Sequence, residues 1–206
     1  MSLIHLARRA ALIGALTAAA LGLAACFGAA PPVPKEQYFR LIATTEPAAV
    51  TAPVTGVVEI PPLQAEGVMG ERPLLFTKDN GLKLEQRNYA YWTDPPPAML
   101  RDQLIAYLRA AKLASNVVPS ELRVDAQYRV EGRIKRLEQL SGSKNGAAIA
   151  LDLALIDKAT DAIVASGSYE VTKDASGADI DDAVHALNEG LNQIFAEFAA
   201  DLAKKG

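Results

Sequence analysis

The chain has 206 residues, a formal net charge of −3 at pH 7 and a single cysteine. This mildly acidic balance gives no electrostatic footprint for nucleic acid or for an anionic lipid surface, so we expect no nucleic-acid partner. The length is sufficient for one domain with a substantial core. No apolar segment after residue 25 is long enough to span a membrane.

The first 25 residues have the features of a bacterial lipoprotein signal peptide. Arg8 and Arg9 precede an uncharged apolar run over residues 10–25, which is too short for a comfortable bilayer span. The run ends in Leu-Ala-Ala-Cys, a lipobox in which small residues admit the signal peptidase and a thiol accepts the lipid. We therefore expect cleavage before Cys26 and lipid attachment at Cys26.

Two alternatives to this leader stay open. An ordinary secretory signal could be cleaved after Ala25, although a lone cysteine in an exported protein makes a poor disulfide half. An uncleaved membrane anchor is the other, although prolines follow the apolar run at once. Phe27 stands where an aspartate commonly retains similar lipoproteins in the inner membrane. We therefore expect a lipid anchor facing the periplasm, with the outer membrane favoured over the inner membrane.

The mature chain divides into a tether and a domain. Residues 26–36 hold the lipidated cysteine and a flexible, proline-containing tether, and residues 37–206 form a single domain. The first half of this domain predicts short strands joined by an irregular loop over residues 63–71. An Asn-Gly pair within residues 78–81 predicts a hairpin turn. The expected strands cover residues 38–42, 54–60, 74–77 and 82–86.

Two helices and three further strands complete the prediction. Apolar residues at steps of three and four predict helices over residues 97–111 and 180–202, the second with Asp179 as its N-cap. Period-two alternation and short turns predict an antiparallel meander of three strands, over residues 128–135, 149–155 and 163–171. The expected fold class is α/β (α+β): a single domain with a mixed or antiparallel sheet, this C-terminal meander, and two main helices behind it.

Residues suited to catalysis are scarce in the mature chain. His185 is its single histidine and lies in the final predicted helix, where we expect a solvated side chain. One histidine with scattered carboxylates does not make a zinc site, and no phosphate-binding GxxxxGK[ST] loop is present. We therefore expect no catalytic residue, no cofactor and no metal, and a protein that is not an enzyme.

One aromatic cluster has two interpretations. Tyr89, Tyr91 and Trp92 could form an anchor in the core or at the edge of the sheet. Alternatively, Tyr91 and Trp92, with Leu63 and Met69 from the glycine-flanked loop, line an exposed surface for acyl chains or for a partner subunit.

The order of these parts resembles the ABC-type transport auxiliary lipoprotein family. After the lipobox and tether, the matching segments are Tyr-x-x-Leu at 38–41, a proline-ended strand at 57–61, Arg-Pro at 72–73, the hairpin at 78–86 and Tyr-Trp-Thr-Asp-Pro at 91–95. In this family an arginine often precedes the tryptophan and a single proline follows it. This chain instead has Tyr91 and three prolines at 95–97.

The resemblance implies a role beside a transporter. The expected protein is an accessory component of an MCE-type transport system for phospholipid or another hydrophobic molecule. Its expected partners are an MCE-domain protein, a permease and an ATPase, and a homo-oligomer is left open. Two other functions remain: a stand-alone periplasmic lipid-binding carrier, and an assembly or pilot lipoprotein of an outer-membrane complex. Strands that alternate with charged residues disfavour the carrier, because no apolar barrel pattern appears.

Overall fold

The computed structural model of the protein describes residues 32–51, 53–78 and 81–204. The folded domain is the compact unit Glu36–Gly206, and its description here covers the described residues of that unit. The predicted signal peptide and the predicted lipid-attachment residue, Cys26, lie outside the described residues.

Within the described part of the chain, nine strands form one mixed sheet built around a long central strand, β7 (Tyr128–Ser141). On one side, β7 pairs antiparallel with β8 (Gly146–Asp157) along almost its whole length. On the other side it pairs in parallel with three shorter strands in succession, β2 (Val54–Ile60), β3 (Gln64–Ala65) and β4 (Pro73–Lys78). Three separate short strands thus pair one after another along the same edge of β7.

The breaks between these three pieces have a local cause. Pro61 and Pro62 follow β2, and proline has no backbone N–H to give to a ladder of hydrogen bonds. The 3₁₀ helix η1 (Gly67–Gly70) then interrupts the chain between β3 and β4. The segment expected to be an irregular loop over residues 63–71 therefore contains one short strand and one helical turn.

The remaining strands extend the sheet at its edges. β9 (Ala162–Asp174) pairs with β8 and completes the predicted meander, which is confirmed. β5 (Leu84–Trp92) pairs with β4, and β1 (Gln37–Phe39) pairs with β5. β6 (Ala114–Pro119) pairs with β2, and η2 (Ser120–Leu122) follows it.

Three details of the N-terminal half differ from the sequence prediction or complete it. β5 continues to Trp92, so the aromatic cluster belongs to a strand and does not merely lead into a helix. β6 was not predicted. The expected turn between β4 and β5 is supported at Gly81, which has a φ of 64° and donates its N–H to Lys78 O at 2.9 Å.

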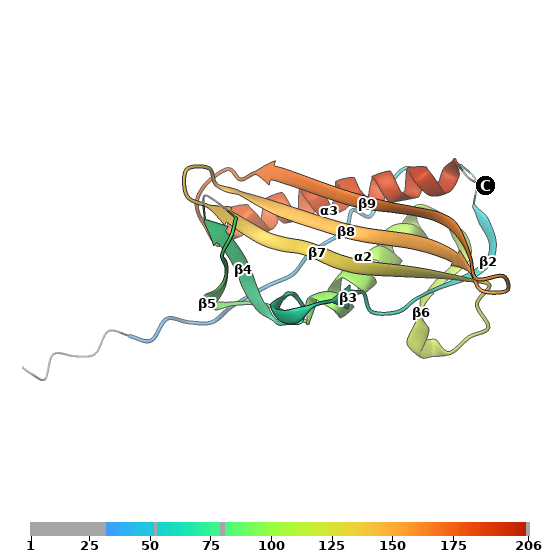
Figure 1. Cartoon of the computed structure of the whole chain (residues 1–206), viewed down its shortest axis with the longest axis horizontal. Coiled ribbons are helices and arrows are strands. Elements are labelled where there is room, and N and C mark those ends of the chain that lie inside the picture. Colours follow the sequence, from blue (N-terminus) through green and yellow to red (C-terminus); the bar gives the residue numbers. More distant parts are fainter. Residues whose placement is uncertain (1–31, 52, 79–80, 205–206) are drawn as a thin grey trace, which may run out of the picture. The chain divides into compact units, whose positions relative to one another are not determined.

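Two helices lie on one face of the sheet (Figure 1). α3 (Ile180–Ala203) packs on β8 and β9, and α2 (Pro96–Ala110) packs beside it near β6 and β3. Pro96 and Pro97 occupy the first turn of α2, where a missing N–H breaks no helical hydrogen bond. Asp179 is the N-cap residue of α3, as predicted, although its side chain makes no capping hydrogen bond.

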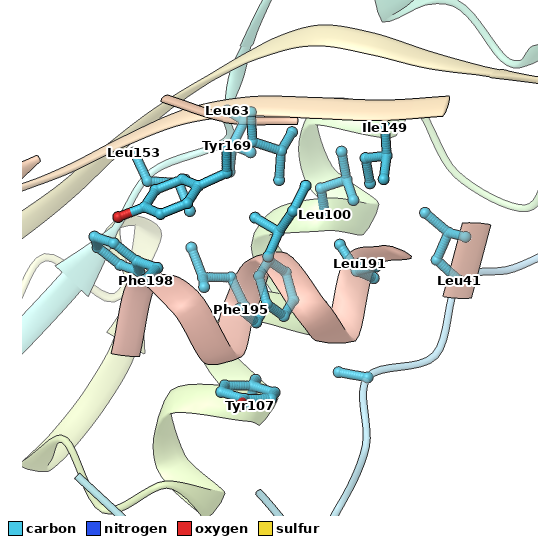
Figure 2. Packing of buried hydrophobic residues seen from close by; sticks show 14 of the residues in the cluster. Leu41, Leu63, Leu100, Tyr107, Ile149, Leu153, Tyr169, Leu191, Phe195 and Phe198 are labelled. Atoms are coloured by element: carbon cyan, nitrogen blue, oxygen red, sulfur yellow. The ribbon is translucent and has the colours of Figure 1, made fainter. Parts of the chain in front are cut away.

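The core between helices and sheet is closely packed (Figure 2). Tyr169 of β9 contacts Phe198 of α3 edge to face, with ring centroids 6.1 Å apart. Gly190 of α3 lies so close to β8 that an added Cβ would come within 2.8 Å of Ile149 Cγ2. The helix and the sheet therefore meet without an intervening space at this point.

Residues 40–51, which we call the strap, follow β1 and are held by side-chain amides from both helices. Asn188 and Asn192 of α3 accept the backbone N–H groups of Ile42 and Thr44, each at 2.7 Å. Gln103 of α2 accepts the intervening N–H of Ala43 at 2.8 Å. Three successive backbone N–H groups of the strap are paired in this way without the segment joining a strand.

Candidate functional site

The described residues show no candidate metal site. They include no group of three or more histidine, cysteine, aspartate or glutamate side chains placed to bind a metal ion. His185 is exposed on α3, as predicted. Over the same described ranges, no helix combines the length and apolar character that a bilayer span requires.

Two of the four residues predicted to form an exposed surface are instead part of the core. Leu63 and Trp92 are 3% and 1% exposed, respectively. Gly132 allows Leu63 to lie against β7, because a Cβ at Gly132 would meet Leu63 Cγ at 2.9 Å. The core-anchor interpretation is thus correct for Trp92, and the surface prediction was wrong for these two residues.

The other two predicted surface residues remain accessible. Met69 in η1 and Tyr91 in β5 are each half-buried. Successive side chains of a strand point to opposite faces, so Tyr91 faces away from the core where Trp92 enters it. Met69 and Tyr91 belong to separate elements, and the closest aromatic neighbour of Tyr91 comes from β1 rather than from the glycine-flanked loop.

The neighbour of Tyr91 is Tyr38, which the sequence did not single out as a site residue. β1 pairs in parallel with β5 so that Tyr38 stands directly beside Tyr91. Their ring centroids are 5.9 Å apart, with 33° between the ring planes. Tyr38 is 54% exposed. An aromatic residue this exposed at the edge of a sheet presents its apolar ring to a partner.

Arg72 adds a positive charge to this pair. Its Cζ lies 5.5 Å from the ring centroid of Tyr38, within the range of a cation–π contact. Its Nε donates to Trp92 O at 3.1 Å, and its own carbonyl accepts the N–H of Trp92 at 2.7 Å. The family that the sequence resembles often has an arginine directly before the tryptophan, where this chain has Tyr91. In this chain the guanidinium near this part of β5 comes from Arg72 instead.

A backbone irregularity affects a third tyrosine, Tyr89, which precedes Tyr91 by two residues in β5. Residues 87–90 of β5 stand opposite the single residue Leu74, because Gln86 pairs with Leu75 and Tyr91 pairs with Pro73. Within this bulge Tyr89 has a φ of 61°, a left-handed conformation that is unfavourable for a bulky side chain. Tyr89 is 39% exposed. We call Tyr38, Tyr89, Tyr91 and Arg72 the tyrosine edge.

Acidic residues accompany the single positive charge of the tyrosine edge. The hydroxyl of Tyr38 donates to the carboxylate of Glu36, and this hydrogen bond raises the pKa of Tyr38. Glu71, adjacent to Arg72, accepts a hydrogen bond from Gln86 Nε2 at 2.8 Å. Tyr38 is therefore neutral at physiological pH, and the charge of Arg72 is accompanied by two nearby carboxylates.

The larger hollows in the described domain are open and partly polar. One, of about 470 Å³, lies on the outer side of the meander, and its lining includes Arg133, Asp152 and Ser168. Ser168 Oγ donates to Asp152 Oδ1 at 2.5 Å, so these polar groups already have partners. Acyl chains are bound in enclosed, largely apolar pockets, which this open and charged depression does not resemble.

A second hollow, of about 280 Å³, is more apolar and lies between the strap and the helices. Val50 and Tyr107 contribute to its lining together with alanines of α3. It is also open to solvent, and small residues make up most of its walls.

One mixed sheet with two helices on one face and an exposed aromatic edge defines an α+β domain. The sequence places this domain in a known family. A model of the ABC-type transport auxiliary lipoprotein component matches residues 39–199, and the chain belongs to this family.

Solved structures share the fold. A crystal structure of a Xanthomonas campestris protein is 18% identical, with a TM-score of 0.72 over 82% of this chain and 96% of that chain. A second crystal structure, of an uncharacterised protein, is 14% identical, with a TM-score of 0.65 over 81% of this chain and 97% of that chain. No curated protein sequence matches the chain.

Membership of this family indicates where in the cell the protein lies and which kind of system it serves. It is a lipoprotein, held at the cell envelope by a lipid anchor, and an auxiliary component of an ABC-type transporter. The association with a transporter that the resemblance implied is therefore confirmed at the level of the family.

Proposed function

We propose that the protein is the periplasmic, lipid-anchored accessory component of an MCE-type transport system that moves phospholipid or another hydrophobic molecule across the envelope. The family match over residues 39–199 carries this proposal. The partners would be an MCE-domain protein, a permease and an ATPase. Cys26 would hold the protein on the outer membrane, because Phe27 lacks the acidic side chain that commonly retains similar lipoproteins in the inner membrane.

We propose that the domain acts by docking rather than by catalysis or by carrying lipid. The packing of α3 on the sheet supports this view, since α3 meets β8 at Gly190 and Ile149 with no space for an acyl chain at this point. The larger hollows are open and partly polar, which suits contact with a protein better than enclosure of a lipid. ATP hydrolysis would belong to another subunit, because the sequence has no phosphate-binding loop.

The test is purification of the full-length lipidated protein from envelope membranes with a C-terminal tag. We expect a permease, an ATPase and an MCE-domain protein to be recovered with it. The Cys26→Ala variant, which would lack the lipid anchor, serves as the localisation control and should recover less of these partners. Recovery of secretin or fibre subunits instead would favour an assembly lipoprotein, and stoichiometric phospholipid on the purified chain without these partners would favour the carrier.

A further inference from the structure

The tyrosine edge has the composition of a membrane-interface surface. Tyrosine has an apolar ring and a polar hydroxyl and gathers at the level of lipid headgroups for this reason. Tyr38 and Tyr89 are 54% and 39% exposed, and Tyr91 stacks beside Tyr38. Arg72 is exposed next to the rings and presents the planar donors that recognise phosphate.

The length of the tether brings this edge within reach of a membrane. Ten residues, 27–36, separate Cys26 from β1, and a fully extended chain spans at most about 3.6 Å per residue. With Cys26 lipidated, Tyr38 would stay within about 45 Å of the bilayer surface in every conformation. The exposed aromatic edge is therefore built on the part of the domain that the tether enters.

We propose that the tyrosine edge rests on the phospholipid headgroups of the membrane that holds the lipid anchor, and so fixes the orientation of the domain on that membrane. This inference rests on the lipid anchor of the proposed function. A short tether keeps the edge at a high effective concentration near the bilayer, so contacts too weak to bind a free domain are sufficient once the chain is anchored.

Three structural features suit this role. The parallel pairing of β1 with β5 fixes Tyr38 beside Tyr91, so the aromatic pair is formed before any contact with lipid. The bulge holds Tyr89 at a φ of 61°, and strained backbone of this kind is often associated with a functional position. Arg72 is held in place by its two hydrogen bonds with the backbone of Trp92, at 3.1 and 2.7 Å.

The acidic residues beside the tyrosine edge determine which lipids it should bind. Glu36 and Glu71 accompany Arg72, so the contact depends on interfacial burial of the rings and not on net positive charge. Binding should therefore occur on zwitterionic lipid, and it should change little with ionic strength. A surface that acts through charge alone would instead require anionic lipid and would be screened by salt.

The test uses the full lipidated protein in vesicles of phosphatidylcholine, with backbone hydrogen exchange as the measurement. We expect residues 37–42 and 84–92 to exchange more slowly in the vesicle-bound protein than in the Cys26→Ala protein in solution. Combined Tyr38→Ser and Tyr89→Ser substitutions should remove this protection while the protein stays on the vesicles. The exposed Ile163 lies in β9, which β8, β7 and β4 separate from β5 in the sheet, and Ile163→Ser is the matched control that should leave the protection unchanged.

Each outcome supports or overturns the proposal. Anchored protein whose β1 and β5 amides gain no protection in vesicles overturns it and leaves the tyrosine edge to a protein partner. Protection that appears only with anionic lipid, or that is lost in salt, also overturns it. Wild-type protein that does not stay on the vesicles would show that the chain has no working anchor, and would overturn the proposal together with the anchor on which it rests. Unchanged core exchange in the tyrosine variants confirms that they are folded.

Discussion

Asn192 of α3 accepts a hydrogen bond from the backbone N–H of Thr44, 148 residues earlier in the chain, at 2.7 Å. One turn earlier on the helix, Asn188 accepts the N–H of Ile42 at the same distance. The chain that leaves β1 is thereby attached to the C-terminal helix. A force applied to the tether would be transmitted to the core through the hydrogen bonds of Asn188 and Asn192 and through the pairing of β1 with β5.

Asn192→Ala should loosen the strap without unfolding the domain. The lost acceptor leaves the N–H of Thr44 to water, so we expect the free energy of unfolding to fall by about 1 kcal/mol or less. Hydrogen exchange should accelerate at residues 42–44 and stay unchanged in β7 and β8. Glu189→Ala, at an exposed position on the same helix, is the control. Equal acceleration in both variants would contradict the role of Asn192.

Gly190→Ala tests the close approach of α3 to β8. Alanine favours a helix by about 1 kcal/mol relative to glycine. Its methyl group would, however, stand 2.8 Å from Ile149 Cγ2, and overpacking of this kind costs about 1–3 kcal/mol. We expect a net loss of up to about 2 kcal/mol in urea unfolding. A shift to higher stability would show that the two layers have room between them.

Gln139→Ala should destabilise the hairpin of β4 and β5. Gln139 is 3% exposed and accepts two hydrogen bonds from Arg87, at 2.7 and 3.1 Å. Arg87 also lies 4.1 Å from the ring centroid of Phe76. Without Gln139 the guanidinium loses a partly buried acceptor, and we expect a loss of about 1–3 kcal/mol. The exposed Gln86→Ala should cost under about 0.5 kcal/mol, and equal losses would argue against the network.

Tyr169→Phe should alter the dependence of stability on alkaline pH. Burial, and then a hydrogen bond from the Tyr169 hydroxyl to Asp201 at 3.0 Å, raise the pKa of Tyr169 above its ordinary value of 10.0. Above pH 10 the unfolded chain loses this proton while the folded chain keeps it, so folding becomes less favourable as pH rises. The difference in unfolding free energy between wild type and variant should be constant below about pH 9 and shrink above pH 10, by at most about 1.4 kcal/mol per pH unit. A constant difference across this window would contradict the raised pKa.

Cys26→Ala should release the protein from membranes. Lipid attachment at Cys26 is a prediction from the lipobox, and without the thiol no acyl chain can be added. The variant should move to the soluble periplasmic fraction, and wild type should require detergent for extraction. Cys26→Ala protein that still requires detergent would mean that another element anchors the chain.

Local patterns in the sequence determined the lipobox at Cys26, the helices and the three-strand meander. Each of these depends on a repeat of two or of three to four residues, or on a short motif, within one segment of the chain. The side-chain periodicity of residues 149–155, for example, reports the two faces of β8 directly.

Only the tertiary structure decided how distant segments combine. β6 pairs in parallel with β2, and Tyr38 is brought beside Tyr91, because partners more than fifty residues apart select each other through shared burial and register. Because β5 continues to Trp92, its successive side chains point to opposite faces, so Tyr91 is accessible and Trp92 lies in the core. The tyrosine edge exists because β1 closes on β5, and that pairing leaves no periodic signal in either segment.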